Sequence, residues 1–160
     1  IFLSADAMRP AKLYEDGLGQ TPRTYAKGIL VIWPANKQSS VIQNLVNTTG
    51  RIAIANPKTA PFGDAAQLYL QTFAQYHELS TRLVFGNNIA QTFQFVDSGN
   101  ASIGLIAESM LVQATAKFPT KRAQYSEYLR VERQHYPEIT LLSEQTQVQL
   151  EAYGYQGLIE

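Results

Sequence analysis

The sequence has no cysteine, which excludes disulfide bonds, thiolate metal sites and cysteine nucleophiles. Its two histidines, His77 and His135, are 58 residues apart, and neither lies at a metal-ligand spacing. We interpret both as structural residues. Ser102-Ile103-Gly104 does not match the nucleophile elbow of hydrolases. Because no nucleophile–base pair and no metal cluster can be found, the sequence predicts no catalytic residues, no metal site and no enzyme.

The chain also lacks an excess of either charge, since 13 Lys and Arg residues balance 13 Asp and Glu residues. A neutral chain gives no electrostatic reason to expect nucleic acid or an anionic membrane as a partner. No apolar run approaches the length of a membrane span. With 45% hydrophobic and 16% charged residues, the composition is that of a globular protein. An anionic ligand would therefore have to be held by local dipoles.

The order of apolar segments predicts an α/β fold. The segment 51–107 alternates strand, helix, strand, helix and strand, and this order favours a mainly parallel sheet. We predict strands at 1–3, 28–33, 51–55, 83–85 and 103–107. We predict helices at 7–15 and 41–46, over an apolar stretch from Ala65 to Tyr76, at 89–97, in part of 109–122, and at 143–153. The polar stretch 123–134 gives no clear pattern.

Two predicted strand-to-helix junctions could bind an anion. They are Asn56–Gly63 and Gly86–Ile89, and each leads into the first turn of a helix. Backbone N–H groups there are unpaired and carry the positive end of the helix dipole, so they attract anions without a formal charge. Every βα unit contains such a turn, and an ordinary structural turn is the more frequent case.

Two segments have a distinctive sequence, Arg51–Gly63 (RIAIANPKTAPFG) and Asn88–Ala101 (NIAQTFQFVDSGNA), the second continuing into Ile103–Ala107. Both resemble segments of the periplasmic molybdate-binding proteins of ABC transporters, in the same order. Ile1–Ala7, Gly28–Trp33 and Gln149–Tyr155, which ends in Tyr-Gly-Tyr, add shorter matches. The matches are spread over nearly the whole chain.

The resemblance implies a type 2 periplasmic-binding-protein fold, with two α/β lobes around a hinge and an oxyanion between them. It implies that molybdate or tungstate is bound by backbone N–H groups and neutral hydroxyls and is delivered to the permease of an ABC importer in the periplasm. No cofactor is expected. Phe62 and Ile89 match the family's backbone donors in the two loops, and Asn88 is the third predicted ligand-binding residue.

The sequence departs from the family at its beginning. Ile1–Asp6 has neither the basic region nor the apolar core of a signal peptide, and we interpret it as a strand from the middle of a domain. The family's first two hydroxyl-bearing loops would precede it. We therefore predict an incomplete first lobe, formed by 1–34 and 123–160 with the hinge strands, and a complete second lobe at 35–122. The exposed sheet edge of a partial lobe suggests self-association.

Two further departures concern the ligand. Some relatives place a tyrosine hydroxyl in the cleft where this chain has Ala107, and Asp64 puts a negative charge on the first predicted anion-binding helix. Two alternatives therefore stay open beside a molybdate or tungstate receptor. One is a receptor for sulfate or phosphate, and the other is a truncated remnant that binds no ligand.

Overall fold

In the computed structural model, the described residues are 2–4, 6–131 and 138–141. The chain divides into two compact units, Ile1–Gly28 with Pro137–Glu160 and Ile29–Tyr136. The predicted lobes are 1–34 with 123–160 and 35–122. Both predicted boundaries, after residue 34 and after residue 122, lie inside the second unit, and the assignment to lobes stays a prediction. No helix among the described residues is long and apolar enough to cross a membrane.

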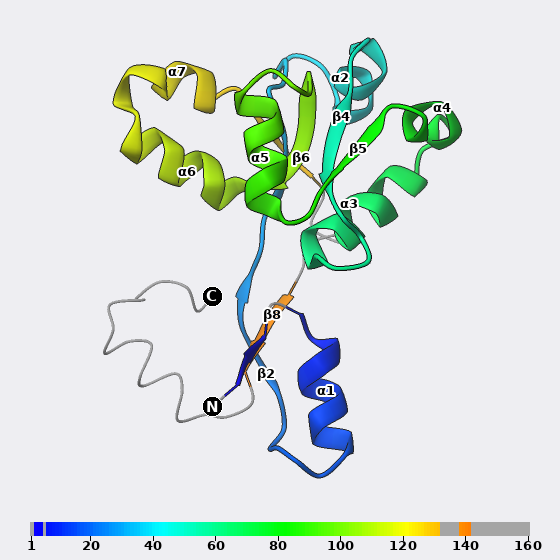
Figure 1. Cartoon of the computed structure of the whole chain (residues 1–160), viewed down its shortest axis with the longest axis vertical. Helices are drawn as coiled ribbons and strands as arrows, with labels where there is room; N and C mark the ends of the chain where they lie inside the picture. The colour runs from blue at the N-terminus through cyan, green and yellow to red at the C-terminus, as the bar shows by residue number, and fades with distance from the viewer. Residues whose placement is uncertain (1, 5, 132–137, 142–160) are drawn as a thin grey trace. The chain divides into compact units, whose positions relative to one another are not determined.

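The described residues of the first unit form a small antiparallel sheet and the helix α1 (Figure 1). The strand order is β1 (Leu3–Ser4), β8 (Glu138–Leu141) and β2 (Arg23–Lys27). Helix α1 (Met8–Glu15) confirms the helix predicted at 7–15. The buried strand predicted at 1–3 is wrong for Leu3, which is exposed at the short strand's start.

The second unit is built on a five-stranded sheet with the order β5-β4-β6-β3-β7. Three neighbouring strands of this sheet are parallel to one another: β5 (Leu83–Gly86), β4 (Ile52–Ala55) and β6 (Ile103–Ala107). This confirms the parallel arrangement predicted for 51–107. Strand β3 (Leu30–Trp33) runs antiparallel to β6, and β7 (Leu129–Arg130) runs antiparallel to β3. All residues of β3, β4 and β6 are buried, as expected for strands covered on both faces.

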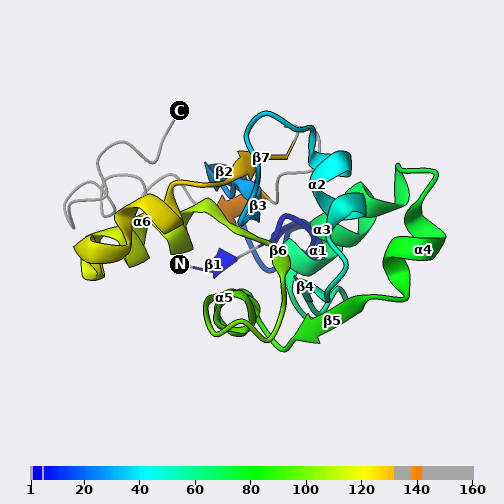
Figure 2. The ribbon, with the colours of Figure 1, turned by 90° about the horizontal axis from the view of Figure 1, so that it is seen from above.

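Helices cover both faces of this sheet (Figure 2). One face carries α2 (Val41–Asn47), α3 (Pro61–Gln71) and α4 (Tyr76–Ser80), and the other carries α5 (Ile89–Asp97) and α6 (Glu108–Lys117). Successive strand residues point to opposite faces, so Ile52 and Ile54 pack in one core and Ala53 in the other.

The predicted helices in the second unit are mostly confirmed, with one correction. The apolar stretch from Ala65 to Tyr76 is not one helix, because α3 ends at Gln71 and α4 begins at Tyr76. Pro119 starts a short 3-10 helix, η1 (Pro119–Lys121), after α6 ends, as expected for a helix breaker. The helix predicted at 143–153 lies outside the described residues.

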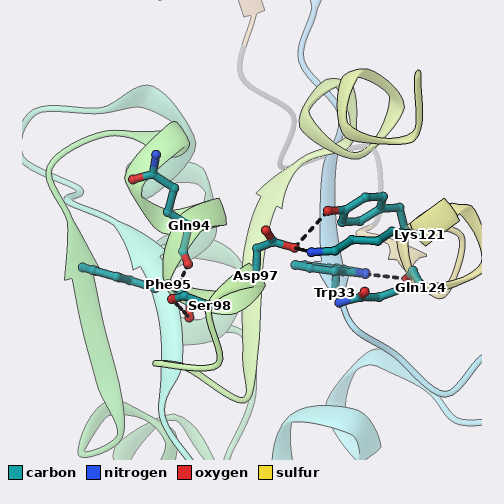
Figure 3. A network of polar contacts seen from close by, with 8 residues as sticks. Trp33, Gln94, Phe95, Asp97, Ser98, Lys121 and Gln124 are labelled. Carbon is teal, nitrogen blue, oxygen red and sulfur yellow. Dashed lines mark hydrogen bonds and ion pairs between the residues drawn. The ribbon is translucent and has the colours of Figure 1, made fainter. Parts of the chain in front are cut away.

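A short helix, α7 (Arg122–Tyr125), is bonded to the last residue of α5 (Figure 3). The Tyr125 hydroxyl donates to Asp97 Oδ1 at 3.0 Å, and Lys121 Nζ lies 3.7 Å from the same oxygen. Trp33 Nε1 donates to the carbonyl of Gln124 at 2.9 Å. Burial, together with Asp97, raises the pKa of Tyr125 to about 12. These contacts tie η1 and α7 to the last residue of α5 and to the end of β3.

Candidate functional site

The two predicted anion-binding turns lie side by side because their strands are neighbours. Ala55, the last residue of β4, pairs with Gly86, the last residue of β5. The backbone N–H of Asn56 continues the pairing and donates to the Gly86 carbonyl at 2.8 Å. Helices α3 and α5 therefore both start from the carboxyl edge of the sheet, the edge where α/β proteins bind their ligands (Figure 1).

The first turn of α3 leaves a backbone donor free. Ala60 precedes the helix in an extended conformation and provides no side-chain cap, and Pro61 has no N–H. The Gly63 and Asp64 N–H groups donate to the Ala60 carbonyl at 2.9 and 3.1 Å. Among the described residues, none accepts a hydrogen bond from the Phe62 N–H. The structure thus leaves Phe62 as the first available donor of this helix.

The loop before α3 is shaped by Asn56 and by a glycine. The Asn56 side-chain oxygen accepts the Lys58 N–H at 3.0 Å, and its carbonyl accepts the N–H groups of Thr59 and Ala60. A Cβ atom on Gly63 would lie only 2.3 Å from the Ala55 carbonyl oxygen. The helix can start this close to the strand only because position 63 has no side chain.

The first turn of α5 is capped by side chains and still leaves two donors. Asn88 is extended, and its side-chain oxygen accepts the Gln91 N–H at 2.9 Å. Gln91 Oε1 in turn accepts the Asn87 N–H at 2.6 Å, an arrangement similar to a capping box. No described residue accepts from the N–H groups of Ile89 or Ala90. The Asn88 side-chain oxygen is therefore used for the helix, while the Ile89 N–H is available.

Close packing also fixes the start of α5. A Cβ atom on Gly86 would lie 2.6 Å from Thr92 Oγ1 and 2.8 Å from the Thr92 backbone nitrogen. Thr92 is fully buried and donates its hydroxyl to the Asn88 carbonyl at 2.9 Å. At each junction a glycine, Gly63 or Gly86, thus allows the helix to pack closely against the end of its strand.

The two donor residues are anchored by separate cores. Phe62 is half-buried and packs against the core beneath α3, whereas Ile89 packs against the core beneath α5. Lys58 and Asp64, one charge of each sign, are both exposed beside the start of α3. The pairing of β4 with β5 brings the two turns together, and their role in binding stays a prediction.

A third helix, α6, also starts at this edge, and the sequence did not indicate the ion pair found there. Ala107 ends β6 with only 2% of its surface exposed, and α6 follows at once with Glu108 in its first turn. The Glu108 carboxylate is buried and accepts from Arg130 Nε and Nη2 at 2.7 and 2.9 Å. Burial and the hydrogen bond to Glu108 raise the pKa of Tyr128. The one sequence feature that could have indicated this ion pair is Glu108 itself, an acidic residue directly after a buried strand.

The described residues contain no group of His, Asp and Glu suited to hold a metal ion. His77 is exposed on α4, and its carbonyl accepts the Ser80 hydroxyl at 2.7 Å. His135 lies outside the described residues.

Comparisons with known proteins agree with this fold. The model of the family described as bacterial extracellular solute-binding protein matches residues 1–148. The molybdate-binding protein ModA of Rhodobacter capsulatus is 40% identical over 116 residues, which cover 70% of this chain and 46% of that protein. ModA of Azotobacter vinelandii is 39% identical over 118 residues, covering 69% of this chain and 46% of that protein.

Solved structures extend the likeness to nearly the whole chain. The periplasmic molybdate-binding protein of Azotobacter vinelandii superposes with a TM-score of 0.69 at 26% identity, covering 98% of this chain and 71% of that structure. The predicted α/β, periplasmic-binding-protein-like fold is thus confirmed. The chain spans less than half the length of the curated relatives it matches. With the family model matching most of its residues, the chain belongs to the bacterial extracellular solute-binding proteins.

Proposed function

We propose that the chain binds a tetrahedral oxyanion, molybdate or tungstate, at the carboxyl edge of the five-stranded sheet. The observation that carries this proposal is the convergence of two helix starts, each with an uncapped backbone donor, at Phe62 and Ile89. A doubly charged oxyanion without protons requires donors only. Helix starts provide such donors together with a partial positive charge.

The energetic contribution of this edge can be bounded. A hydrogen bond to a charged group contributes about 1.5–3 kcal/mol, so the N–H groups of Phe62 and Ile89 together would contribute about 3–6 kcal/mol. Because association also costs several kcal/mol of translational and rotational freedom, two donors alone give weak binding. A tight receptor would need further donors beside these two.

We further propose that the chain acts as the receptor of an ABC importer and delivers the anion to its permease in the periplasm. The family membership and the names of the relatives support this role. Self-association through the sheet of the first unit stays a prediction from the sequence. Its test is the molar mass in solution, and a monomer at all concentrations would refute it.

The anion specificity is tested by calorimetric titration and thermal shift with molybdate, tungstate, sulfate and phosphate. A ligand that binds only the folded state raises the melting temperature by mass action. Binding of molybdate and tungstate above sulfate and phosphate is the expected result. Binding of none of the four would contradict the proposal and would favour the non-binding remnant.

The predicted donor is tested by Ile89→Pro. Ile89 is the first residue of α5, the position where helices accept proline, and Asn88 before it is already extended. The substitution therefore removes the N–H group with little change to the backbone. Ile89→Ala is the matched control, since it shortens the same side chain and keeps the donor. We expect Ile89→Pro to weaken anion binding about tenfold or more relative to Ile89→Ala.

One observation favours a protonated phosphate as the alternative ligand. Asp64 lies exposed in the first turn of α3, and a carboxylate can accept the proton that phosphate carries and molybdate lacks. Asp64→Asn separates the two cases. Tighter molybdate binding with unchanged or weaker phosphate binding would assign Asp64 to the site. A phosphate affinity that exceeds that of molybdate in the unaltered chain would replace the first proposal with the second.

A further inference from the structure

The ion pair between the buried Glu108 and the exposed Arg130 bears on the charge at the proposed site. Glu108 is the first residue of α6, and only 8% of its surface is exposed. Its carboxylate is held by Arg130 through two hydrogen bonds of 2.7 and 2.9 Å. A negative side chain at a helix start is common, but at an anion-binding edge it opposes the ligand.

The sheet register places Glu108 at the same edge as the proposed donors. Ile52 and Ala53 of β4 pair with Ile103 and Gly104 of the parallel strand β6. Continuing this register, Ala107 lies level with Asn56, the residue that follows β4. Since neighbouring strands are about 4.8 Å apart, Glu108 is one strand spacing from the start of the α3 loop and two from that of the α5 loop.

Arg130 reaches Glu108 from the opposite side. It lies on β7 and pairs with Val31 of β3, and β3 separates β7 from β6. By strand order, the Arg130 backbone is therefore farther from the starts of α3 and α5 than the Glu108 backbone is. The Glu108 N–H is bound as well, because it donates to the Ile29 carbonyl at 2.9 Å. The start of α6 thus combines a bound backbone donor with a neutralised carboxylate.

We propose that Arg130 is a positioning residue that makes this edge acceptable to an anion by neutralising and holding the Glu108 carboxylate. The proposal rests on the proposed oxyanion binding and concerns its strength. Neither side chain needs to touch the ligand. Arg130 holds the carboxylate through two hydrogen bonds and balances its charge, and the donors at Phe62 and Ile89 then determine the potential at the site.

The size of the effect follows from Coulomb's law. A unit charge about 10 Å from a doubly charged anion in water changes its affinity about threefold at low salt. Removing the negative charge with Glu108→Gln should strengthen binding by about this factor. Removing the positive charge with Arg130→Gln should weaken it by about two- to threefold, because Arg130 is farther away. The double substitution should restore the affinity of the unaltered chain.

The test is calorimetric titration of molybdate into the 160-residue chain and its variants, at low salt and at about 0.5 M salt. We expect the two single substitutions to change the molybdate affinity in opposite directions and Arg130→Lys to leave it near that of the unaltered chain. At high salt, all these differences in affinity should disappear. A purely structural role would instead weaken binding in both single variants at both salt concentrations. Lys117→Gln is the matched control, since it removes one positive charge at the other end of α6, about 14 Å from Glu108 along the helix axis.

The outcomes separate this inference from the proposed function. If the unaltered chain binds molybdate but the two single variants shift its affinity in the same direction or not at all, the role of Arg130 is refuted while anion binding stands. If the Lys117→Gln control weakens binding as much as Arg130→Gln, the effect is one of overall charge and the inference fails. If the unaltered chain binds none of the four anions, the proposed function fails and the inference fails with it.

Discussion

Replacing Gly63 by alanine tests whether the close approach of α3 to β4 forms the proposed donor site. A Cβ atom at position 63 would lie 2.3 Å from the Ala55 carbonyl oxygen and 2.7 Å from the carbonyl carbons of Ala55 and Asn56. These are backbone atoms of the sheet edge, so they cannot rotate away as a flexible side chain would. The start of α3 must move instead, and the Phe62 N–H moves with it.

The expected cost can be derived from two opposing effects. In an exposed helix, alanine is more favourable than glycine by about 0.5–1 kcal/mol. Here the new atom must retreat by at least 0.7 Å to reach the 3.0 Å that real Cβ contacts observe. Such overpacking costs about 1–3 kcal/mol. The cost of overpacking should exceed the gain in helix propensity, so Gly63→Ala should lower the free energy of unfolding by about 1–2 kcal/mol.

The assay is urea unfolding followed by the fluorescence of Trp33, the only tryptophan of the chain, which is buried in the second unit and stacks on Phe93. Gln71→Ala, an exposed change at the other end of α3, is the control and should leave the midpoint unchanged. We also expect Gly63→Ala to weaken molybdate binding about tenfold, because one charged hydrogen bond is misplaced. An unchanged or higher midpoint would refute the reasoning, since helix propensity would then outweigh the contact.

Two further predictions concern α5 and α7. Asn88→Ala should lower the free energy of unfolding by about 1 kcal/mol, because the side-chain cap of the Gln91 N–H is lost. Asn88→Asp should keep this cap but weaken molybdate binding through its negative charge. Urea unfolding measures the first effect and calorimetric titration the second. The pKa of Tyr125 is raised from 10.0 to about 12 in the folded chain, so its contribution to stability is fully present below pH 10 and is lost as the pH rises towards 12. Urea midpoints from pH 9 to 12 should therefore fall more steeply for the unaltered chain than for Tyr125→Phe, and parallel curves would contradict the hydrogen bond to Asp97.

The central strands could be predicted from the sequence because burial on both faces leaves a continuous apolar run. Ile52–Ala55 and Ile103–Ala107 are such runs, and every residue in them is buried. Strands β2 and β7 could not be found this way. β2 (Arg23–Lys27) contains no fully buried residue and pairs with β8, more than 100 residues later in the chain. Its strand conformation depends on this distant partner, which no local pattern reveals.

The break between α3 and α4 shows a different limit of the sequence pattern. The apolar spacing continues through Phe73 and Tyr76, and both pack against the same core as α3. The helix nevertheless ends after Gln71, where the Thr72 hydroxyl donates to the Tyr69 carbonyl at 2.7 Å. A side chain that binds the backbone of the last turn competes with helix continuation. Periodicity reports which residues face the core and does not report where the backbone turns.

The candidate site was predictable only in part, because its donors are backbone atoms. The residue types at Phe62 and Ile89 carry no chemical signature of anion binding, and their selection depended on the family resemblance. The register pair of Ala55 with Gly86 brings the two turns together, and it follows from strand pairing over 31 residues of sequence. The Glu108–Arg130 pair was missed because Arg130 lies in the polar stretch whose structure the sequence did not indicate.

A neutral chain can still select an anion if its donors are fixed before the ligand arrives. The starts of α3 and α5 are held by the Asn56 hydrogen bond to Gly86 and by the tight contacts of Gly63 and Gly86. These constraints belong to the fold of the second unit, so the donors need little reordering on binding, and the entropic cost of association is reduced accordingly. Such a site depends on geometry more than on long-range charge. Single side-chain charges near it, at Asp64 and Glu108, therefore adjust the affinity by small factors, whereas displacement of a backbone donor should change it by an order of magnitude.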